Sequence, residues 1–193
     1  MKKMKFLLMF VIFTISANAQ TNWVFDKSHT TIGFGVTHLI ISEVTGRFES
    51  FDGSVTSKSD DFQDADIEFE IDAKSINTDN KKRDEHLSSD DFFNADKFPK
   101  LIFKSTSMKK VGENRYKLVG NFTMRDITKQ IELEVKLNGV IKDPYGNTKA
   151  GFKITGALDR FDYGLKWNSL MEAGGAVVGK TVTLYMNVEL QKK

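Results

Sequence analysis

The apolar residues of this chain recur at every second position over most of its length, and this spacing restricts the fold more than any other feature. The segment "TIGFGVTH" places Ile32, Phe34 and Val36 on one face, and "ADIEFEID" alternates four apolar with four acidic residues at 65–72. Successive side chains of a β-strand point to opposite faces, so the spacing predicts half-buried strands. About eight such strands are expected, at 31–38, 47–55, 65–72, 100–107, 115–122, 130–139, 151–159 and 181–190.

Turn-forming residues separate these strands, at Asn114, at Asn138-Gly139 and in "DPYGN" at 143–147. One long polar segment departs from the alternation, "NTDNKKRDEHLSSDDFFNADKFP" at 77–99. Asn77 or Thr78 is suited to cap a first helix there, and the Ser88-x-x-Asp91 box is suited to begin a second. We therefore predict a crossover at about 77–97 that carries one or two short helices.

An antiparallel chain with one apolar face per strand must bury that face in a sandwich or in a closed barrel, and closure also removes exposed strand edges. We predict an all-β fold, an eight-stranded antiparallel barrel. The chain has no cysteine, so its stability must come from an apolar core. No linker, repeat or low-complexity tract marks a boundary, and residues 20–193 are expected to form a single domain.

The first nineteen residues have the pattern of a cleavable secretory signal. Lys2, Lys3 and Lys5 precede a mostly apolar run at 6–15, and small residues follow at Ala17 and Ala19. The run is about half as long as the roughly 20 residues that a membrane-spanning helix needs. We predict cleavage after Ala19 and a periplasmic or secreted protein with no transmembrane segment.

Removal of this signal also removes the basic excess of the chain. Three of the 28 basic residues and none of the 26 acidic residues lie in it, which leaves 25 against 26. A chain with this balance has no electrostatic footprint for nucleic acid and no polybasic patch for anionic lipid heads. We expect no nucleic-acid partner.

The sixteen phenylalanines leave two interpretations of the barrel interior open. Phe34, Phe69, Phe122 and Phe152 all fall on faces predicted to point inward. They could form a dense aromatic core, or they could line a cavity, since an eight-stranded barrel can hold one apolar ligand.

Three motifs decide which known family the sequence resembles: "WVFDKSHTTIGFGVTHLIISEVTGRFESFDGSV" (23–55), "SINTDNKKRDEHLSSDDFFNADKFPKLIFKS" (75–105) and "LDRFDYGLKWN" (158–168). In this order they resemble the YceI-like family of bacterial lipid- and polyisoprenoid-binding proteins, over residues 22–190. The resemblance implies an extended, lipocalin-like barrel whose apolar tunnel holds an isoprenoid chain, usually in the periplasm and without catalysis. The inward side chains expected to contact that chain are Phe34, Val36, Phe48, Ile67, Phe69, Phe103, Phe122, Phe152, Ile154 and Trp167.

One loop departs from the family pattern. In "TMRDITKQIEL", Asp126 and Gln130 stand where the family more often has glycine and proline. Aspartate tolerates a left-handed backbone better than most residues, so we expect the turn to be kept.

The polar candidates could contact a ligand headgroup or could tie the crossover to the barrel. They include the positions matching the family signatures "DxxHS/T" (Asp26, His29, Thr30) and "RDxHL" (Arg83, Asp84, His86, Leu87), and the cluster in "DRFDYGLKWN". We expect no metal site, because His29 and His38 are nine positions apart and would face opposite sides of one regular strand, and because His86 lies in the polar crossover. The candidates are His29, His38, Arg83, His86, Arg160 and Asp162.

The stretch "GGAVVGKT" at 174–181 matches the pattern of a phosphate-binding loop, but such a loop must lead into a helix. Here an alternating strand follows, so no nucleotide site is expected. The chain also lacks a cysteine nucleophile and a G-x-S-x-G motif. We therefore predict no catalytic residue, no enzyme activity and no cofactor.

The sequence accordingly predicts a protein that holds a long apolar lipid in the barrel for transport, storage or sequestration. The lipid could be an isoprenoid quinone, a polyprenyl phosphate or a fatty-acid-like chain. The alternative is an envelope stress or interaction module with a solid core and no bound lipid. The sequence does not distinguish a monomer from a homodimer.

Overall fold

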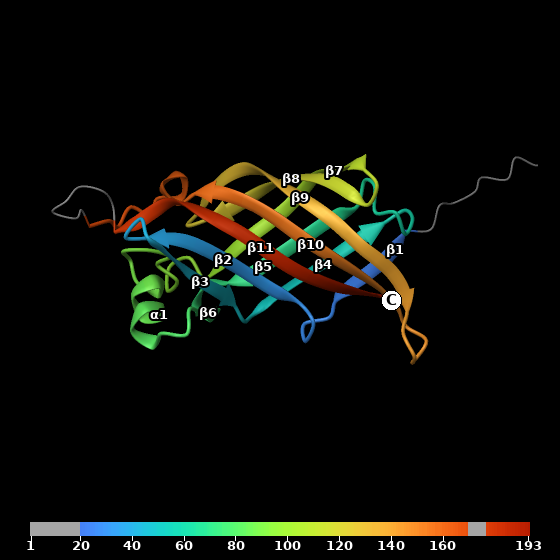
Figure 1. Cartoon of the computed structure of the whole chain (residues 1–193), viewed down its shortest axis with the longest axis horizontal. Helices are drawn as coiled ribbons and strands as arrows, with labels where there is room; N and C mark the ends of the chain where they lie inside the picture. Colours follow the sequence, from blue (N-terminus) through green and yellow to red (C-terminus); the bar gives the residue numbers. More distant parts are fainter. Residues whose placement is uncertain (1–19, 170–176) are drawn as a thin grey trace, which may run out of the picture.

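The computed structural model describes residues 20–169 and 177–193, and the predicted signal at 1–19 lies outside the described residues. Its strands form one elongated antiparallel barrel with a helical segment at one end (Figure 1). The strands are β1 (Thr21–Phe25), β2 (Thr31–His38), β3 (Ser42–Phe48), β4 (Phe51–Ser57), β5 (Asp66–Asp72), β6 (Ile76–Asn77), β7 (Lys100–Gly112), β8 (Arg115–Met124), β9 (Ile127–Lys142), β10 (Thr148–Asp159) and β11 (Val178–Lys192).

The predicted eight-stranded barrel is confirmed, and eleven segments build it because three barrel strands are interrupted. β1 and β2 pair in succession with the same edge of β11, and β4 and β3 pair with their other edges. β5 and β6 likewise pair in succession with β4 and β3. Each interrupted pair therefore occupies one position in an up-and-down barrel, which β11 closes.

The break between β1 and β2 is filled by side-chain hydrogen bonds. Thr30 Oγ1 accepts a hydrogen bond from the Glu189 amide at 3.1 Å and donates to the Glu189 carbonyl at 3.4 Å. The Asp26 amide donates to the same carbonyl at 2.9 Å. The edge of β11 thus keeps its backbone partners where one neighbouring strand ends and the next begins. The predicted strand at 47–55 is broken in a similar way at residues 49 and 50, between β3 and β4.

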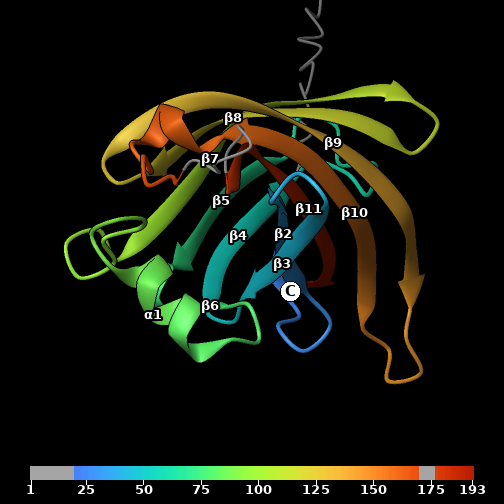
Figure 2. The same cartoon turned by 60° about the vertical axis from the view of Figure 1, so that its left-hand side comes forward.

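The predicted crossover contains one α-helix, α1 (Lys81–Ser88), and no second helix lies between α1 and β7, a stretch that the structure describes in full. Asn80 is the N-cap, and its side chain accepts a hydrogen bond from the Arg83 amide, so Asn77 and Thr78 were the wrong cap candidates. The expected second helix is replaced by turns at 90–97 that lead to β7. Figure 2 shows α1 below one open end of the barrel.

Two turn predictions had different outcomes. Arg125 and Asp126 form a two-residue turn between β8 and β9 with φ angles of 51° and 59°, so the turn expected at Asp126 is confirmed. Asn138-Gly139, in contrast, lies inside β9. The register shifts there, since Gly151 pairs with Gly139 and Phe152 with Leu137, and the φ angle of Gly139 is 155°. A glycine within a strand often marks such a bulge.

Among the described residues, no helix has the length and apolar character required to cross a membrane.

Candidate functional site

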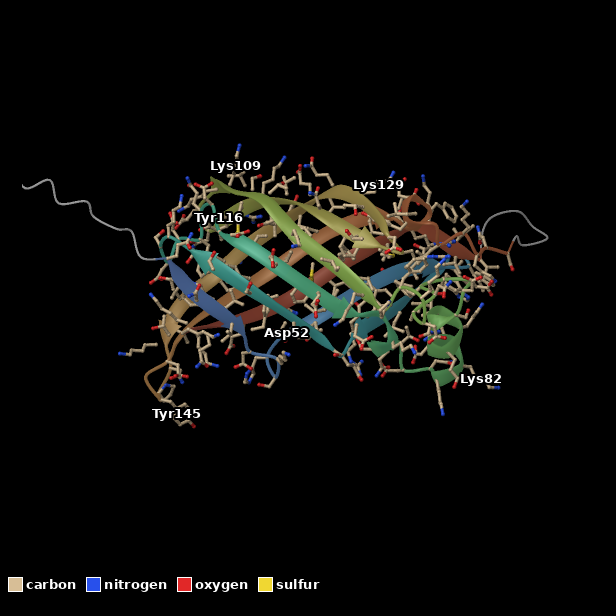
Figure 3. The ribbon with its side chains drawn as sticks, turned by 180° about the vertical axis from the view of Figure 1, so that it is seen from behind. Asp52, Lys82, Lys109, Tyr116, Lys129 and Tyr145 are labelled. Atoms are coloured by element: carbon tan, nitrogen blue, oxygen red, sulfur yellow. The ribbon has the colours of Figure 1, made fainter. Side chains whose placement is uncertain are left out.

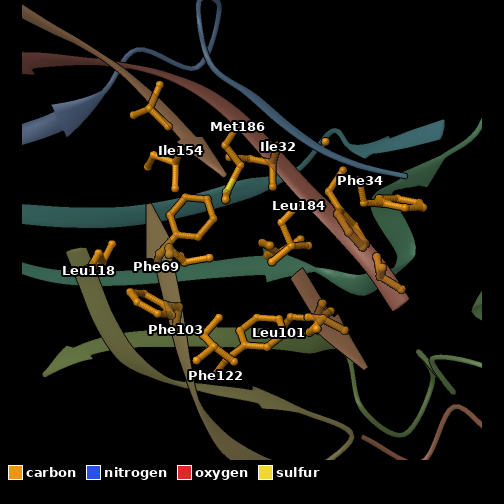
Figure 4. A pocket seen from close by; sticks show the side chains of 18 of the residues that line it. Ile32, Phe34, Phe69, Leu101, Phe103, Leu118, Phe122, Ile154, Leu184 and Met186 are labelled. Atoms are coloured by element: carbon orange, nitrogen blue, oxygen red, sulfur yellow. The ribbon is translucent and has the colours of Figure 1, made fainter. Parts of the chain in front are cut away.

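The barrel encloses an apolar cavity of about 200 Å³ (Figure 4). Ten of the eleven strands contribute side chains to its wall, and Leu87 of α1 adds one from the crossover. Apart from Arg160, every side chain that the described residues contribute to the wall is aliphatic, aromatic or a methionine. Such a wall offers burial to an apolar chain and almost no hydrogen bonds to a polar one.

Nine of the ten side chains expected to face a ligand lie on this wall. They come from six strands, because the two-residue alternation of each strand places its apolar positions on one side of the sheet. The nine are Phe34, Val36, Phe48, Ile67, Phe69, Phe103, Phe122, Phe152 and Ile154.

Trp167, the tenth, is not part of this wall. Its indole is partly buried outside the cavity, in a cluster with His86 and Phe92. The ring centroids lie 5.3 Å apart in both pairs. Trp167 follows η2 (Arg160–Tyr163), a 3₁₀ turn at the end of β10, so it belongs to no strand whose alternation could have predicted its direction.

Several wall residues were missed by sequence reasoning. Phe25 ends β1, a strand too short to show clear alternation, and Phe62 sits in the loop before β5 with a φ angle of 54°. Phe92 and Phe93 come from the turns after α1. The adjacent phenylalanines in the polar crossover were the available signal, since a purely solvated segment would not require them.

Two glycines make room for aromatic rings of the wall. A Cβ on Gly46 would lie 2.5 Å from the ring of Phe34, and a Cβ on Gly120 would lie 2.4 Å from the ring of Phe103. Both rings lie across the backbone of a neighbouring strand and do not extend across the barrel. The cavity stays open beside them for this reason.

One end of the cavity is bounded by aromatic rings that pack in tilted and edge-on pairs. The ring of Phe62 lies 4.9 Å from that of Trp23 and 4.8 Å from that of Phe152. Trp23 is fully buried, and its indole Nε1 donates a hydrogen bond to Ser57 Oγ at 2.9 Å. This packing forms a floor beneath the cavity.

The other end of the cavity is formed by the crossover and by the residues around η2. Leu87, Phe92, Phe93 and Leu165 contribute apolar side chains there. Arg160, which is 2% exposed, is the only charged residue of the wall within the described parts of the chain, 20–169 and 177–193. Any polar headgroup in the cavity would therefore meet its best partner at this end.

The Arg160 guanidinium is held by backbone carbonyls. Nη1 donates to Leu165 at 2.6 Å and to Trp167 at 2.8 Å, while Nε and Nη2 donate to Gly179 at 2.9 Å and to Val178 at 3.2 Å. Burial lowers the pKa of Arg160 below its ordinary value. The contacts join η2 to the first residues of β11 and place a buried positive charge at the cavity end.

The crossover is fastened to the barrel by Arg83 and Asp84. Arg83 Nε donates to the hydroxyl of the buried Thr78 at 2.8 Å, and Nη2 donates to the Thr78 carbonyl at 2.8 Å. Asp84 accepts hydrogen bonds from the Thr78 amide and hydroxyl. These contacts are of the kind that the structural alternative predicts for Arg83, which is absent from the cavity wall.

Arg125, which sequence reasoning missed, fastens the turns after α1. Its Nη1 donates to the carbonyls of Phe92 at 2.7 Å and Gly164 at 3.0 Å, which joins the β8–β9 turn to the crossover and to η2. Its guanidinium also lies 5.9 Å from the ring centre of Phe98. A tight turn at 124–127 gave no signal that its arginine would bridge three segments.

His86 and Asp162 lie outside the cavity wall. Nε2 of His86 is 2.9 Å from Asp91 Oδ2, and its ring packs edge-on against Phe92. Asp162 is exposed and forms an ion pair with Lys129 at 3.4 Å. His38 ends β2, where it pairs with Ser42 and with Val178.

His29 lies in the break between β1 and β2 and is not part of the cavity wall. Its Nδ1 is 3.0 Å from Asp26 Oδ2, and the Glu189 carboxylate completes a group whose ligand atoms lie within 4.8 Å of one another. Lys149 Nζ donates to Asp26 at 2.6 Å and to Glu189 at 2.8 Å. The lysine thus supplies the positive charge between these carboxylates.

The phosphate-loop pattern at 174–181 is described only from Val177 onward, and residues 174–176 lie outside the described part. From Val178 the chain continues as strand β11. In the described part of this motif the chain therefore enters a strand and not a helix.

A family model for the YceI-like domain matches residues 23–190. The chain belongs to the YceI-like family. A UPF0312 protein of Staphylococcus aureus (strain N315) is 39% identical to this YceI-like chain over 170 residues, which cover 88% of this chain and 96% of the relative.

Two solved structures place the YceI-like barrel among known folds. The YceI protein of Campylobacter jejuni matches with a TM-score of 0.70 at 31% identity, over 87% of this chain and 96% of its own. A polyisoprenoid-binding domain from Saccharophagus degradans shares the fold with a TM-score of 0.64 at 14% identity, over 89% and 98%. The predicted family and barrel fold are confirmed by these comparisons.

Proposed function

We propose that this YceI-like protein binds one long apolar lipid inside its barrel and carries or stores it. The observation that supports this function best is the cavity wall, in which Arg160 is the single charged residue that the structure describes and stands among aliphatic and aromatic side chains. The S. degradans neighbour, which shares the fold, is named as a polyisoprenoid-binding domain. An isoprenoid tail, with branched methyl groups along an apolar chain, is the ligand class we favour.

Apolar burial alone can supply the affinity of such a complex. Each Å² of apolar surface removed from water contributes about 25 cal/mol, so a tail needs few polar contacts. Arg160 sets the orientation, because a headgroup with an acceptor oxygen would lie at its end of the cavity. The tail would then extend toward the floor formed by Trp23 and Phe62.

The ligand must widen the cavity as it enters. Drug-sized ligands occupy pockets of about 300–1,000 Å³, which exceeds the about 200 Å³ of this cavity. Phe34, Leu184 and Met186 of the wall are only partly buried, so they are the wall side chains best placed to turn aside. Methionine is unbranched and adapts well to a changed neighbour.

We further propose that the protein acts without catalysis and outside the cytoplasm. The second proposal rests on the secretory pattern of residues 1–19. The alternative of an interaction module with a solid core is disfavoured by the cavity itself, because protein interiors leave few voids larger than a water molecule.

Native mass spectrometry of the protein purified from its own cell envelope without detergent tests this function. We expect a 1:1 adduct that solvent extraction releases as an isoprenoid lipid. A mass equal to that of the bare chain, unchanged after incubation with quinones, polyprenyl phosphates and fatty acids, would instead support the interaction module.

A further inference from the structure

The tip of the β2–β3 hairpin presents apolar side chains to solvent. Ile40 is 66% exposed and Ile41 is 87% exposed, and Leu39 precedes them. Hairpin tips are usually polar, because their backbone and side chains face water. The two isoleucines contribute nothing to the core of the barrel.

The backbone of this turn also disfavours the residues it carries. Leu39 and Ile40 have φ angles of 50° and 68°, and the Ile41 amide donates to the His38 carbonyl at 3.3 Å to close the turn. Two central residues with positive φ are the pattern of turns that favour Asn-Gly. Ile40 is the only β-branched residue with positive φ among the described residues. An exposed isoleucine at this position favours neither folding nor solubility. We therefore attribute its presence to a contact with something outside the molecule.

The hairpin tip lies at the α1 end of the barrel, at which Arg160 and the crossover end the cavity (Figure 1). Val36, two positions before His38, is a wall residue that pairs with Val44 and Val182. The Leu39 amide donates to the Val177 carbonyl at 2.9 Å, which fixes the tip against the segment that enters β11. The apolar tip thus lies on the same hairpin as the wall residue Val36, just past the α1 end of the barrel.

The size of this apolar tip excludes a stable protein partner. Specific protein–protein interfaces bury about 800 Å² on each side and involve roughly 20–30 residues. Three aliphatic side chains on one turn fall far short of that number. A bilayer, in contrast, accepts a few apolar side chains at its interface, since lipid surrounds them on all sides.

Charge indicates which kind of membrane surface the tip fits. The stretch "THLIISEV" at 37–44 contains no lysine or arginine and one acid, Glu43. Attraction to anionic headgroups therefore contributes little, and insertion depends on apolar contact. Binding to a neutral bilayer is expected, with weak dependence on salt.

We propose that Leu39–Ile41 insert into the surface of a lipid bilayer and hold the α1 end of the cavity against it. The purpose of this contact rests on the proposed function, because a bound lipid would then move between membrane and barrel without crossing water. The contact itself is a separate property, which the protein would have whether or not the cavity is filled.

Flotation with neutral phosphatidylcholine vesicles tests the contact. The variant Ile40→Ser/Ile41→Ser should bind at least about tenfold more weakly than the unaltered protein. Ile141→Ser is the matched control, because Ile141 is 65% exposed at the end of β9 that leads to Tyr145. Figure 3 places Tyr145 at the opposite end of the barrel from Lys82 of α1. No flotation of the unaltered protein, or equal flotation of all three proteins, would overturn the proposal.

A second variant separates insertion from a merely structural turn. Leu39→Asn/Ile40→Gly supplies the residues that a turn with two positive φ angles favours, so it should raise the melting temperature and still weaken vesicle binding at least about tenfold. A higher melting temperature with unchanged vesicle binding would contradict the inference. So would a homodimer, found by sedimentation without vesicles, that dissociates when Ile40 and Ile41 are replaced.

The proposed function and the membrane contact can fail independently in these experiments. Retention of a fluorescent polyisoprenoid in solution reports only on the cavity, whereas flotation of ligand-free protein reports only on the tip. The tip variants should retain the polyisoprenoid as the unaltered protein does and should accept it from vesicles at least about tenfold more slowly.

Discussion

At the residue scale, two tyrosine hydroxyls are buried without a hydrogen-bond partner among the described residues, those of Tyr116 and Tyr163. Burial raises the pKa of Tyr163 to about 12, so this phenol stays protonated at neutral pH. A buried polar group without a partner costs about 1–3 kcal/mol. These hydroxyls therefore contribute nothing to the stability of the barrel in this form.

The variant Tyr116→Phe should consequently leave the free energy of unfolding unchanged or raise it by up to about 2 kcal/mol. Tyr185→Phe is the matched control, because the Tyr185 hydroxyl donates to the Phe34 carbonyl at 2.9 Å and its loss should cost about 1 kcal/mol. Urea denaturation of both variants measures the difference. A loss larger than about 1 kcal/mol in Tyr116→Phe would show that this hydroxyl has a partner after all.

Asp26 gives the fold a pH dependence. The hydrogen bonds from Lys149, and then from Ser28, hold the pKa of Asp26 well below its ordinary value. Its contribution to stability is thus fully present above the unfolded pKa of about 3.9 and is lost as the pH falls through the folded pKa. The same pair raises the pKa of Lys149, whose contribution is present below its unfolded pKa of about 10.4 and is lost as the pH rises through the folded pKa.

The variant Asp26→Asn should therefore unfold about 2 kcal/mol more easily at pH 7, and the difference from the unaltered protein should shrink as the pH falls below about 4. Asp162→Asn, which breaks the exposed pair with Lys129, should change stability by less than about 0.5 kcal/mol. Thermal unfolding between pH 2 and pH 8 provides the comparison. An unchanged difference across that range would show that the Asp26 charge is not what stabilises the β1–β2 break.

At the scale of elements, the crossover is the part of the barrel whose order depends on few contacts. α1 has no buried residue, and the turns after it are held by the carbonyl contacts of Arg125. Segments of this kind open locally at lower free energy than the core strands do. The crossover is accordingly the part of the cavity end best suited to move when a ligand enters.

Replacing Arg125 by Met should lower the opening free energy of residues 90–98 by about 2 kcal/mol, since two buried carbonyls lose a charged donor. Lys129→Met removes a charge from an exposed pair on the neighbouring strand and should leave that opening unchanged. Hydrogen exchange followed by mass spectrometry measures both. Equal protection of this segment in the two variants would contradict the role assigned to Arg125.

The strands were predictable from the sequence because their alternation is a local property of the backbone, whereas the crossover was not. Phe92 reaches the cavity and Trp167 does not, although both are aromatic residues in irregular segments. The Phe92 carbonyl is bound by Arg125, 33 residues away in the chain, and the Trp167 carbonyl by Arg160, which also binds carbonyls of β11. Alternation within a strand gives no information on such contacts. The N-cap at Asn80 was missed for a smaller reason, since Asn77, Thr78 and Asn80 are all good capping residues.

At the scale of the whole molecule, sequence alone could not distinguish a solid core from a cavity. Alternation states which side chains point inward, but the space left between them depends on the barrel radius and on how rings such as Phe34 and Phe103 lie on Gly46 and Gly120. The structure shows an apolar cavity whose two ends differ. Aromatic rings bound one end, and at the other end the buried Arg160 guanidinium is held by backbone carbonyls. A carrier of apolar chains requires this asymmetry.

The most direct test of this account is lipid occupancy, measured by native mass spectrometry, in a barrel whose cavity has been filled by a larger side chain. Leu184 lies on the cavity wall, where it is the cross-strand neighbour of Phe34 in the β2–β11 pairing. Thr183, the residue before it, is exposed. Leu184→Trp should fold, as judged by circular dichroism, and should retain an isoprenoid at least about tenfold less well, whereas Thr183→Trp should retain it unchanged. Full occupancy in a folded Leu184→Trp protein would show that the lipid, if bound, is not held in this cavity.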